Sequence, residues 1–97
     1  MAFVYMVVCS DGTLYTGWAA DVEARVRDHN AGRGSIYCRQ RRPVRLVYQE
    51  ELPTRSAAQR REGVIKRMPR RKKLELIEQA CRGNPRGCPD GWENDHA

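Results

Sequence analysis

The chain has 97 residues, which suits a single domain with a modest hydrophobic core. Lys and Arg number 18 against 12 for Asp and Glu, and the resulting charge of +6 favours a polyanionic partner. The sequence shows no apolar run long enough for a membrane span, and no signal peptide is expected because the basic leader and small-residue cleavage site are missing. The four cysteines form no CxxC pair, so we expect a reduced, cytoplasmic protein.

The chain opens with a predicted β-hairpin. The segment Phe3–Cys9 is aromatic, β-branched and apolar, which is the composition of a strand. A second strand is predicted to begin with Leu14–Trp18, after a three-residue loop that ends in Gly12. Such a loop needs its last residue in the left-handed region, and glycine adopts that conformation without strain.

The loop length determines which side chains of the hairpin lie together. It pairs Tyr5 with Gly17, and the alternation of side chains along a strand then places Tyr5 and Tyr15 on one face. Two readings are open at this point. The tyrosines are ordinary cross-strand aromatics, or they form the wall of a site that the neighbouring glycine leaves accessible.

A helix is predicted next, with Asp21 as its N-cap and Asn30-Ala31-Gly32 as its end. Helical spacing places four residues on the face that packs against the hairpin: Val22, Arg25, Val26 and His29. An arginine on a packing face is costly unless it is paired or lines a cavity. Arg25 and His29 are therefore either structural or part of a site.

These residues together resemble the GIY-YIG nuclease superfamily, specifically its small single-domain bacterial (UPF0213-like) group. Val4-Tyr5-Met6 corresponds to the first family motif and Tyr15-Thr16-Gly17 to the second. The helix after the hairpin supplies the family arginine at Arg25. Further along, the run RREGVIKRM matches the segment with the family's metal-binding glutamate, here Glu62. Trp18 departs from the pattern, because the family often has lysine or a small polar residue there.

The middle of the chain is basic and then strand-like. The loop after the first helix contains an aromatic residue among cations, which suits a surface that grips phosphates or, alternatively, a solvated loop: Tyr37, Arg39, Arg41 and Arg42. Apolar and polar residues alternate along Val44–Glu50 sufficiently to predict a third strand. That alternation places Leu46 and Tyr48 on one face and Val47 on the other.

Two helices are predicted in the last third of the ordered chain. The run Ser56-Ala57-Ala58-Gln59 fits a capping box, and the helix that it opens has Glu62 at the edge of its buried stripe. Glu62 is either an ion-pair partner of Lys66 or, as the resemblance favours, a metal ligand. After Pro69, the tetrad RRKK opens the next helix and is either a phosphate-binding patch or a solvated face.

We expect an α+β fold with a three-stranded, mainly antiparallel sheet flanked by helices. The resemblance covers residues 3–80, so 1–80 is the predicted nuclease-like domain. Residues 81–97 are rich in Gly, Asn, Pro and Asp and are expected to form a disordered tail.

The resemblance implies a metal-dependent endonuclease that hydrolyses DNA, in repair or in the processing of branched or single-stranded DNA. It implies one Mg²⁺, which Mn²⁺ can replace, on Glu62. The implied catalytic residues are Tyr5, Tyr15, Arg25 and His29, and the expected substrate-binding residues are Gly17, Tyr37, Arg39, Arg41 and Arg42. Sequence leaves open whether Tyr5 or His29 is the general base. The alternatives are a non-catalytic nucleic-acid-binding module and an interaction subunit that docks through Trp92.

Overall fold

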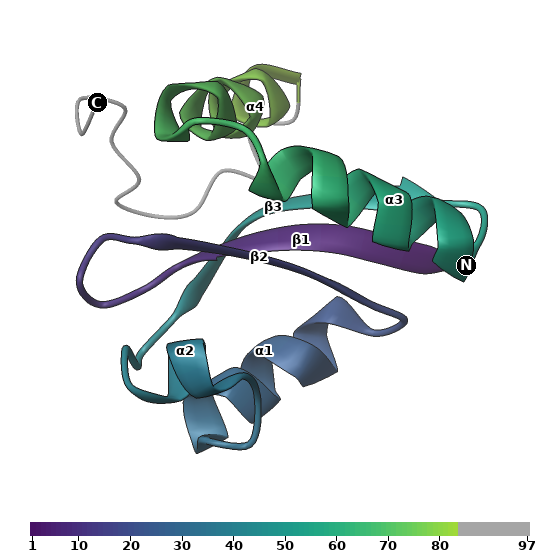
Figure 1. Ribbon diagram of the computed structural model, residues 1–97. Coiled ribbons are helices and arrows are strands. Elements are labelled where there is room, and N and C mark those ends of the chain that lie inside the picture. Colours follow the sequence, from purple (N-terminus) through teal and green to yellow (C-terminus); the bar gives the residue numbers. More distant parts are fainter. Residues whose placement is uncertain (84–97) are drawn as a thin grey trace.

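The computed structural model describes residues 1–83, and most of the predicted tail lies outside the described residues. Its elements in chain order are β1 (Ala2–Val8), β2 (Leu14–Ala19), α1 (Val22–Ala31), α2 (Ile36–Arg39), β3 (Arg45–Leu52), α3 (Arg55–Lys66) and α4 (Arg70–Gly83). Figure 1 shows the sheet as a middle layer, with α3 and α4 above it and α1 and α2 below it. The predicted α+β class is confirmed. Within residues 1–83, every helix is too short or too polar to cross a membrane.

The sheet is antiparallel throughout, and β1 is its central strand in the order β2-β1-β3. The predicted hairpin register is confirmed, because Tyr5 lies opposite Gly17 and Val7 opposite Tyr15. The Cys9 N–H donates to the Thr13 carbonyl at 2.8 Å and closes the loop, in which Gly12 has a φ of 84°. Tyr5 and Tyr15 therefore point to the same face, toward the layer of α1 and α2.

The predicted alternation in the third strand is wrong. Met6 pairs with Tyr48 and Val7 with Leu46, so Val47 is an extra residue in a β-bulge. An extra residue reverses the phase of the alternation beyond it. Leu46 consequently packs below the sheet, while Val47 and Tyr48 both pack above it.

The helix ends follow local capping chemistry. Asp21 caps α1 as predicted, with its Oδ1 accepting from the Ala24 N–H at 3.1 Å. The predicted capping box at Ser56 is wrong, because Thr54 is the N-cap of α3 and its Oγ1 accepts from the Ala57 N–H at 3.1 Å. Thr54 has extended backbone dihedrals, so the helix starts before Ser56 is reached. The four-residue helix α2 is absent from the sequence-based predictions, because so short an element has almost no periodicity.

Two separate clusters of buried side chains lie on the two faces of the sheet. The upper core joins the sheet to α3 and α4, and its members include Val4, Met6, Val47, Ala58, Ile65, Leu74 and Ile77. The lower core joins the sheet to α1 and α2, and its members include Tyr5, Val7, Cys9, Val22, Cys38 and Val44. The alternate side chains of β1 supply both cores, which is why this strand is buried on both faces.

Candidate functional site

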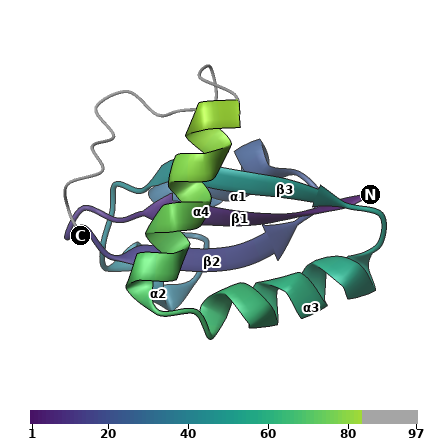
Figure 2. The ribbon, with the colours of Figure 1, turned by 90° about the horizontal axis from the view of Figure 1, so that it is seen from above.

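A cavity of about 280 Å³ lies along the exposed edge of β2, between α1 and α3. It brings together the four predicted catalytic residues, the predicted metal ligand and one predicted substrate-binding residue: Tyr5, Tyr15, Arg25, His29, Glu62 and Gly17. Figure 2 shows why α3 can contribute, because this helix runs alongside β2 while α4 crosses over the strands. Residues far apart in the sequence thus share one cavity.

Tyr5 and His29 form a buried hydrogen-bonded pair at the base of the cavity. The Tyr5 Oη lies 2.8 Å from the His29 Nε2, and the two residues are only 1% and 2% exposed. On the other side of the ring, the Ser35 backbone N–H donates to the His29 Nδ1 at 3.3 Å. A backbone N–H can only donate, so the hydrogen-bond network assigns an accepting Nδ1 and a protonated Nε2. His29 therefore donates to Tyr5, and the phenol hydrogen is left to point at another acceptor.

Two glycines make room for this pair. A Cβ atom on Gly17 would lie 2.6 Å from the Tyr5 Oη, and one on Gly34 would overlap the His29 Nδ1. The predicted substrate contact of Gly17 stays a prediction, and in the structure the missing side chain leaves space for the Tyr5 phenol. Gly34 and Ser35 were missed by sequence reasoning. Ser35 contributes only its backbone N–H, a group that every residue except proline has, so its residue type did not predict this contact. The glycines of the loop were the only sequence feature that could have drawn attention to it.

Burial keeps both members of the pair neutral near pH 7. It raises the pKa of the Tyr5 phenol, and Tyr15 raises it further, whereas Arg25 lowers it only in part. Burial also lowers the pKa of His29, and the positive charge of Arg25 acts in the same direction. Arg25 alone therefore does not offset the effect of burial on the Tyr5 pKa.

Arg25 reaches the cavity from its rim. The predicted packing face of α1 is present, with Val22 and His29 buried, but Arg25 is exposed instead of buried with them. It lines the cavity and forms no hydrogen bond or ion pair with any residue that the structure describes. Its guanidinium group is therefore free to bind an anion that enters.

Glu62 forms the ion pair predicted for its position and also lines the cavity, while its role as a metal ligand stays a prediction. It forms an ion pair with Lys66, with Oε1 and Nζ 3.6 Å apart, and its side chain is 22% exposed while lining the cavity. A partly exposed carboxylate with oxygen donors suits one hard divalent cation that keeps its remaining ligands as water and substrate. Residues 1–83 contain no cluster of three or more potential metal-ligating side chains, so Glu62 would be the protein ligand of such an ion in this cavity.

The other predicted substrate-binding residues lie outside the cavity. Tyr37 stacks on Tyr15 with ring centroids 5.9 Å apart, and Arg41 lies 3.9 Å above the Tyr37 ring while pairing with Asp11. Arg39 and Arg42 line a separate and larger hollow of about 410 Å³. This hollow shares no lining residue with the smaller cavity, in which the predicted catalytic residues meet. The substrate-binding role of these four residues stays a prediction.

The basic tetrad opens α4, which lies with α3 above the sheet (Figure 1), and none of its four residues lines the cavity. Arg70 donates to the Gly12 carbonyl at 3.1 Å, and Lys72 pairs with Glu75 at 3.7 Å. Arg70 therefore joins the start of α4 to the hairpin loop. Two of the four cations thus have contacts within the protein.

Comparison with known proteins identifies related chains of similar length. The family model described as the GIY-YIG catalytic domain matches residues 1–75. A UPF0213 protein of Staphylococcus aureus (strain Mu3) is 58% identical over 77 residues, which cover 79% of this chain and 94% of that protein.

Two solution NMR structures share the fold. The UPF0213 protein BH0048 from Bacillus halodurans is 39% identical with a TM-score of 0.55, over 90% of this chain and 92% of that chain. The protein EF2693 from E. faecalis is 34% identical with a TM-score of 0.55, over 80% of this chain and 83% of that chain. The names of these relatives state no substrate and no reaction.

Proposed function

Because the chain belongs to the GIY-YIG family, we propose that it is a metal-dependent endonuclease that hydrolyses phosphodiester bonds in DNA. Nucleases of this family generally depend on a divalent metal ion and act on nucleic acid. The observation that carries the proposal is the convergence of Tyr5, His29, Arg25 and Glu62 on one cavity. We further propose DNA as the substrate, in repair or in the processing of branched or single-stranded DNA, and Mg²⁺ or Mn²⁺ as the ion.

The residues divide the work of phosphodiester hydrolysis among them. Arg25 has a planar donor fork with no partner among the described residues, and it would bind the oxygens of the scissile phosphate. Glu62 would hold the divalent ion, which when bound supplies Lewis-acid stabilisation of the leaving oxygen. Tyr15 and His29 pack in a T-shaped arrangement, with ring centroids 5.5 Å apart, and Tyr15 would help to keep the Tyr5–His29 pair in place.

The hydrogen bonds of His29 support Tyr5 as the general base. With Nδ1 accepting from Ser35 and Nε2 already protonated, His29 has no free lone pair for a proton from Tyr5 or from water. It instead offers an N–H that stabilises a Tyr5 phenolate. His29 is then a positioning residue, and Tyr5 accepts the proton of the attacking water in its phenolate form, after the phenol proton has been lost to solvent.

The pH dependence of cleavage distinguishes the two bases. A phenol whose pKa is raised is mostly protonated at neutral pH, so the rate should rise with pH well into the alkaline range. A histidine base with a lowered pKa would be deprotonated already, and the rate would be flat above about pH 6.5. We expect log kcat/KM to rise between about pH 7 and 9 with a slope near 1. A plateau over that range would reject Tyr5.

The function is tested with labelled single-stranded, duplex and branched DNA, and with RNA, in Mg²⁺, Mn²⁺ or EDTA. We expect metal-dependent cutting that Arg25→Gln and Glu62→Gln each lower by about 100-fold or more, the usual cost of one preorganised stabilising group. Arg27→Gln on α1 and Glu75→Gln on α4 are matched controls, because both residues are exposed and lie outside the cavity. These controls should cut like the wild type.

Two outcomes would decide against the nuclease. Salt-dependent binding without cutting of any substrate in either metal would identify a nucleic-acid-binding module instead. Equal losses in the cavity variants and their controls would show that general charge, and not the cavity, governs activity. Thermal unfolding of each variant must be checked first, so that lost activity is not lost folding.

A further inference from the structure

We propose that the catalytic cavity continues into a nucleotide subsite in which Trp18 stacks on a base and Arg55 binds a phosphate. The inference rests on the proposed function, because a nucleic-acid strand cut in the cavity must continue along the protein surface. The subsite would hold the nucleotide next to the cleaved bond. It would thereby contribute affinity and set the position of the cut along the strand.

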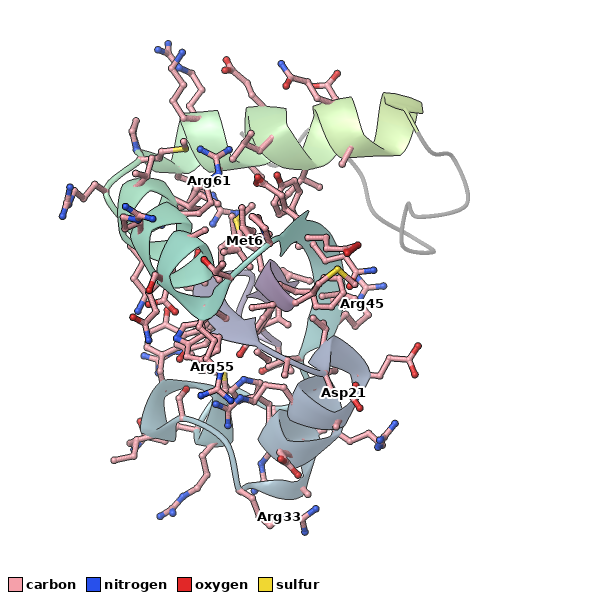
Figure 3. The ribbon with its side chains drawn as sticks, turned by 90° about the vertical axis from the view of Figure 1, so that its right-hand side faces the viewer. Met6, Asp21, Arg33, Arg45, Arg55 and Arg61 are labelled. Carbon is pink, nitrogen blue, oxygen red and sulfur yellow. The ribbon has the colours of Figure 1, made fainter. Side chains whose placement is uncertain are left out.

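The geometry of the β2 edge points to this subsite. A second hollow, of about 360 Å³, is lined by Trp18 and Arg25, which also line the catalytic cavity. The two hollows therefore adjoin at these side chains, and we refer to them together as the groove. Arg55, the first residue of α3, lines the second hollow from the opposite wall. Figure 3 shows Arg55 between α3 and the layer of α1 and α2.

Trp18 is suited to stack on a base because the protein already orders its side chain. It is partly buried and packs against the upper core on one side, while it lines both hollows on the other. An indole that is ordered before binding loses little side-chain entropy when a base stacks on it. Base–aromatic stacking is also tolerant of sequence, since every base has a π-face.

The charges in the groove favour a phosphate at Arg55. Neither Arg25 nor Arg55 has a hydrogen bond or ion pair with the residues described in the structure. By contrast, Arg33, Arg41 and Arg61 are each paired with a carboxylate. Two free guanidinium groups facing one groove attract consecutive phosphates of a strand.

Two carboxylates also line the second hollow, and both are engaged. The Asp21 carboxylate caps α1 through the Ala24 N–H. The Asp28 carboxylate pairs with Arg33 at 3.3 Å. They reduce the positive potential of the hollow, yet their preferred partners already belong to the protein. The donors left for a ligand are those of the arginines.

The test uses DNA binding in EDTA, where no cleavage occurs. The probes are fluorescein-labelled oligodeoxynucleotides of one sequence, single-stranded or duplex, intact or with an abasic unit on either side of the bond that is cut in Mg²⁺. The variants are Trp18→Leu, Trp18→Phe and Arg55→Gln, with Arg60→Gln as control because Arg60 is exposed on α3 and lies outside the groove. A Trp92→Phe background makes Trp18 the single tryptophan for fluorescence.

We expect an abasic unit on one side of the cut to weaken wild-type binding about 5-fold or more, the lower end for loss of one stacked base. Trp18→Leu should weaken binding of intact DNA by a similar factor, and in this variant the abasic unit should cause no further loss of affinity (the abasic penalty). Trp18→Phe should keep most of the affinity for intact DNA and most of the abasic penalty. Arg55→Gln should reduce the slope of log affinity against log salt by about 1, and Arg60→Gln should not. DNA should quench Trp18 fluorescence.

The outcomes separate this proposal from the nuclease proposal. An abasic penalty that persists unchanged in Trp18→Leu, or Trp18 emission that saturating DNA leaves unchanged, would overturn the subsite even if DNA is cut. A third outcome is that DNA quenches Trp18 fluorescence and Trp18→Leu binds DNA more weakly, but no form of the protein cleaves DNA. That result would support the subsite as part of a binding surface and would reject the nuclease proposal. Because Trp18 packs on the core, unfolding of the Leu variant is measured first; Arg55→Gln and Trp18→Phe test the site without that risk.

Discussion

The two faces of the sheet differ in what they bury. The upper core consists of hydrophobic side chains, with Met6, Ile65 and Ile77 fully buried, and the one buried polar residue described on that face is Thr16, which lies opposite Met6. The lower face buries Tyr5 and His29 among its apolar side chains, and this hydrogen-bonded pair lines a cavity that is open to solvent. Burying a polar group costs free energy unless the group is hydrogen-bonded, so this pair depends on its contacts with each other and with Ser35. The comparison indicates that the upper face is stabilised mainly by apolar burial, whereas the lower face combines apolar burial with a hydrogen-bonded pair held in a fixed position at the cavity.

Tyr5→Phe tests the chemical side of this comparison and should have the largest effect. The substitution removes the hydroxyl that accepts from His29 and that we propose as the general base. We expect kcat to fall by about 10²- to 10⁴-fold, the range for loss of a general acid or base. Single-turnover cleavage below the melting temperature of the variant measures this. Retention of near wild-type kcat would place the base elsewhere.

Ile65→Ala tests the stability side. Ile65 is fully buried in the upper core, and its truncation should lower the free energy of unfolding by about 2–5 kcal/mol. Cleavage per folded molecule should be unchanged. The matched control is Val64→Ala, one position earlier on α3, because Val64 is 45% exposed and should change stability by about 0.5 kcal/mol or less. Urea unfolding compares the two variants, and equal losses would contradict the assignment of the upper core.

Gly34→Ala should damage the site more than the fold. Its new Cβ would overlap the His29 Nδ1, so the ring must move and the contact with Tyr5 must change. We expect cleavage to fall by about 10-fold or more, as for other small displacements of catalytic groups. Gly63→Ala is the contrasting change, because only Arg67 lies within 4 Å of its added Cβ. That variant should keep activity and gain about 0.5–1 kcal/mol of stability from the better helix former.

The smallest of the expected effects is a loss of stability in acid, caused by protonation of His29 on the lower face. The pKa of this imidazole is lowered in the folded protein, so between that value and the ordinary 6.5 the unfolded chain binds more protons. The free energy of unfolding therefore falls as the pH drops below about 6.5 and is unaffected by His29 above it. Denaturant titrations from about pH 5 to 8 measure this, with His29→Gln as reference. A wild-type curve with the same slope as the variant would exclude His29 as the cause.

The sequence by itself determined the local geometry of the site. A three-residue loop between two strands sets the hairpin register, and the register places Tyr5 and Tyr15 on one face. Helical spacing likewise placed His29 with Val22 on the packing face of α1, between an Asp cap and a Gly end. These features follow from interactions within a few residues, and such interactions can be derived from residue order.

Four further features were decided by tertiary structure alone: the start of α3, the bulge in β3, the tautomer of His29 and the groove at the β2 edge. Thr54 and Ser56 are both good N-caps, and nothing local predicted that Thr54 would start α3. The bulge at Val47 arises from pairing with β1, a strand far away in the chain. The tautomer of His29 depends on the Ser35 backbone N–H, a group that has no residue-specific signal. Trp18, Arg25 and Arg55 line one hollow because α1 and α3 pack on opposite sides of the β2 edge. That packing depends on contacts between segments far apart in the chain, which local sequence patterns do not predict.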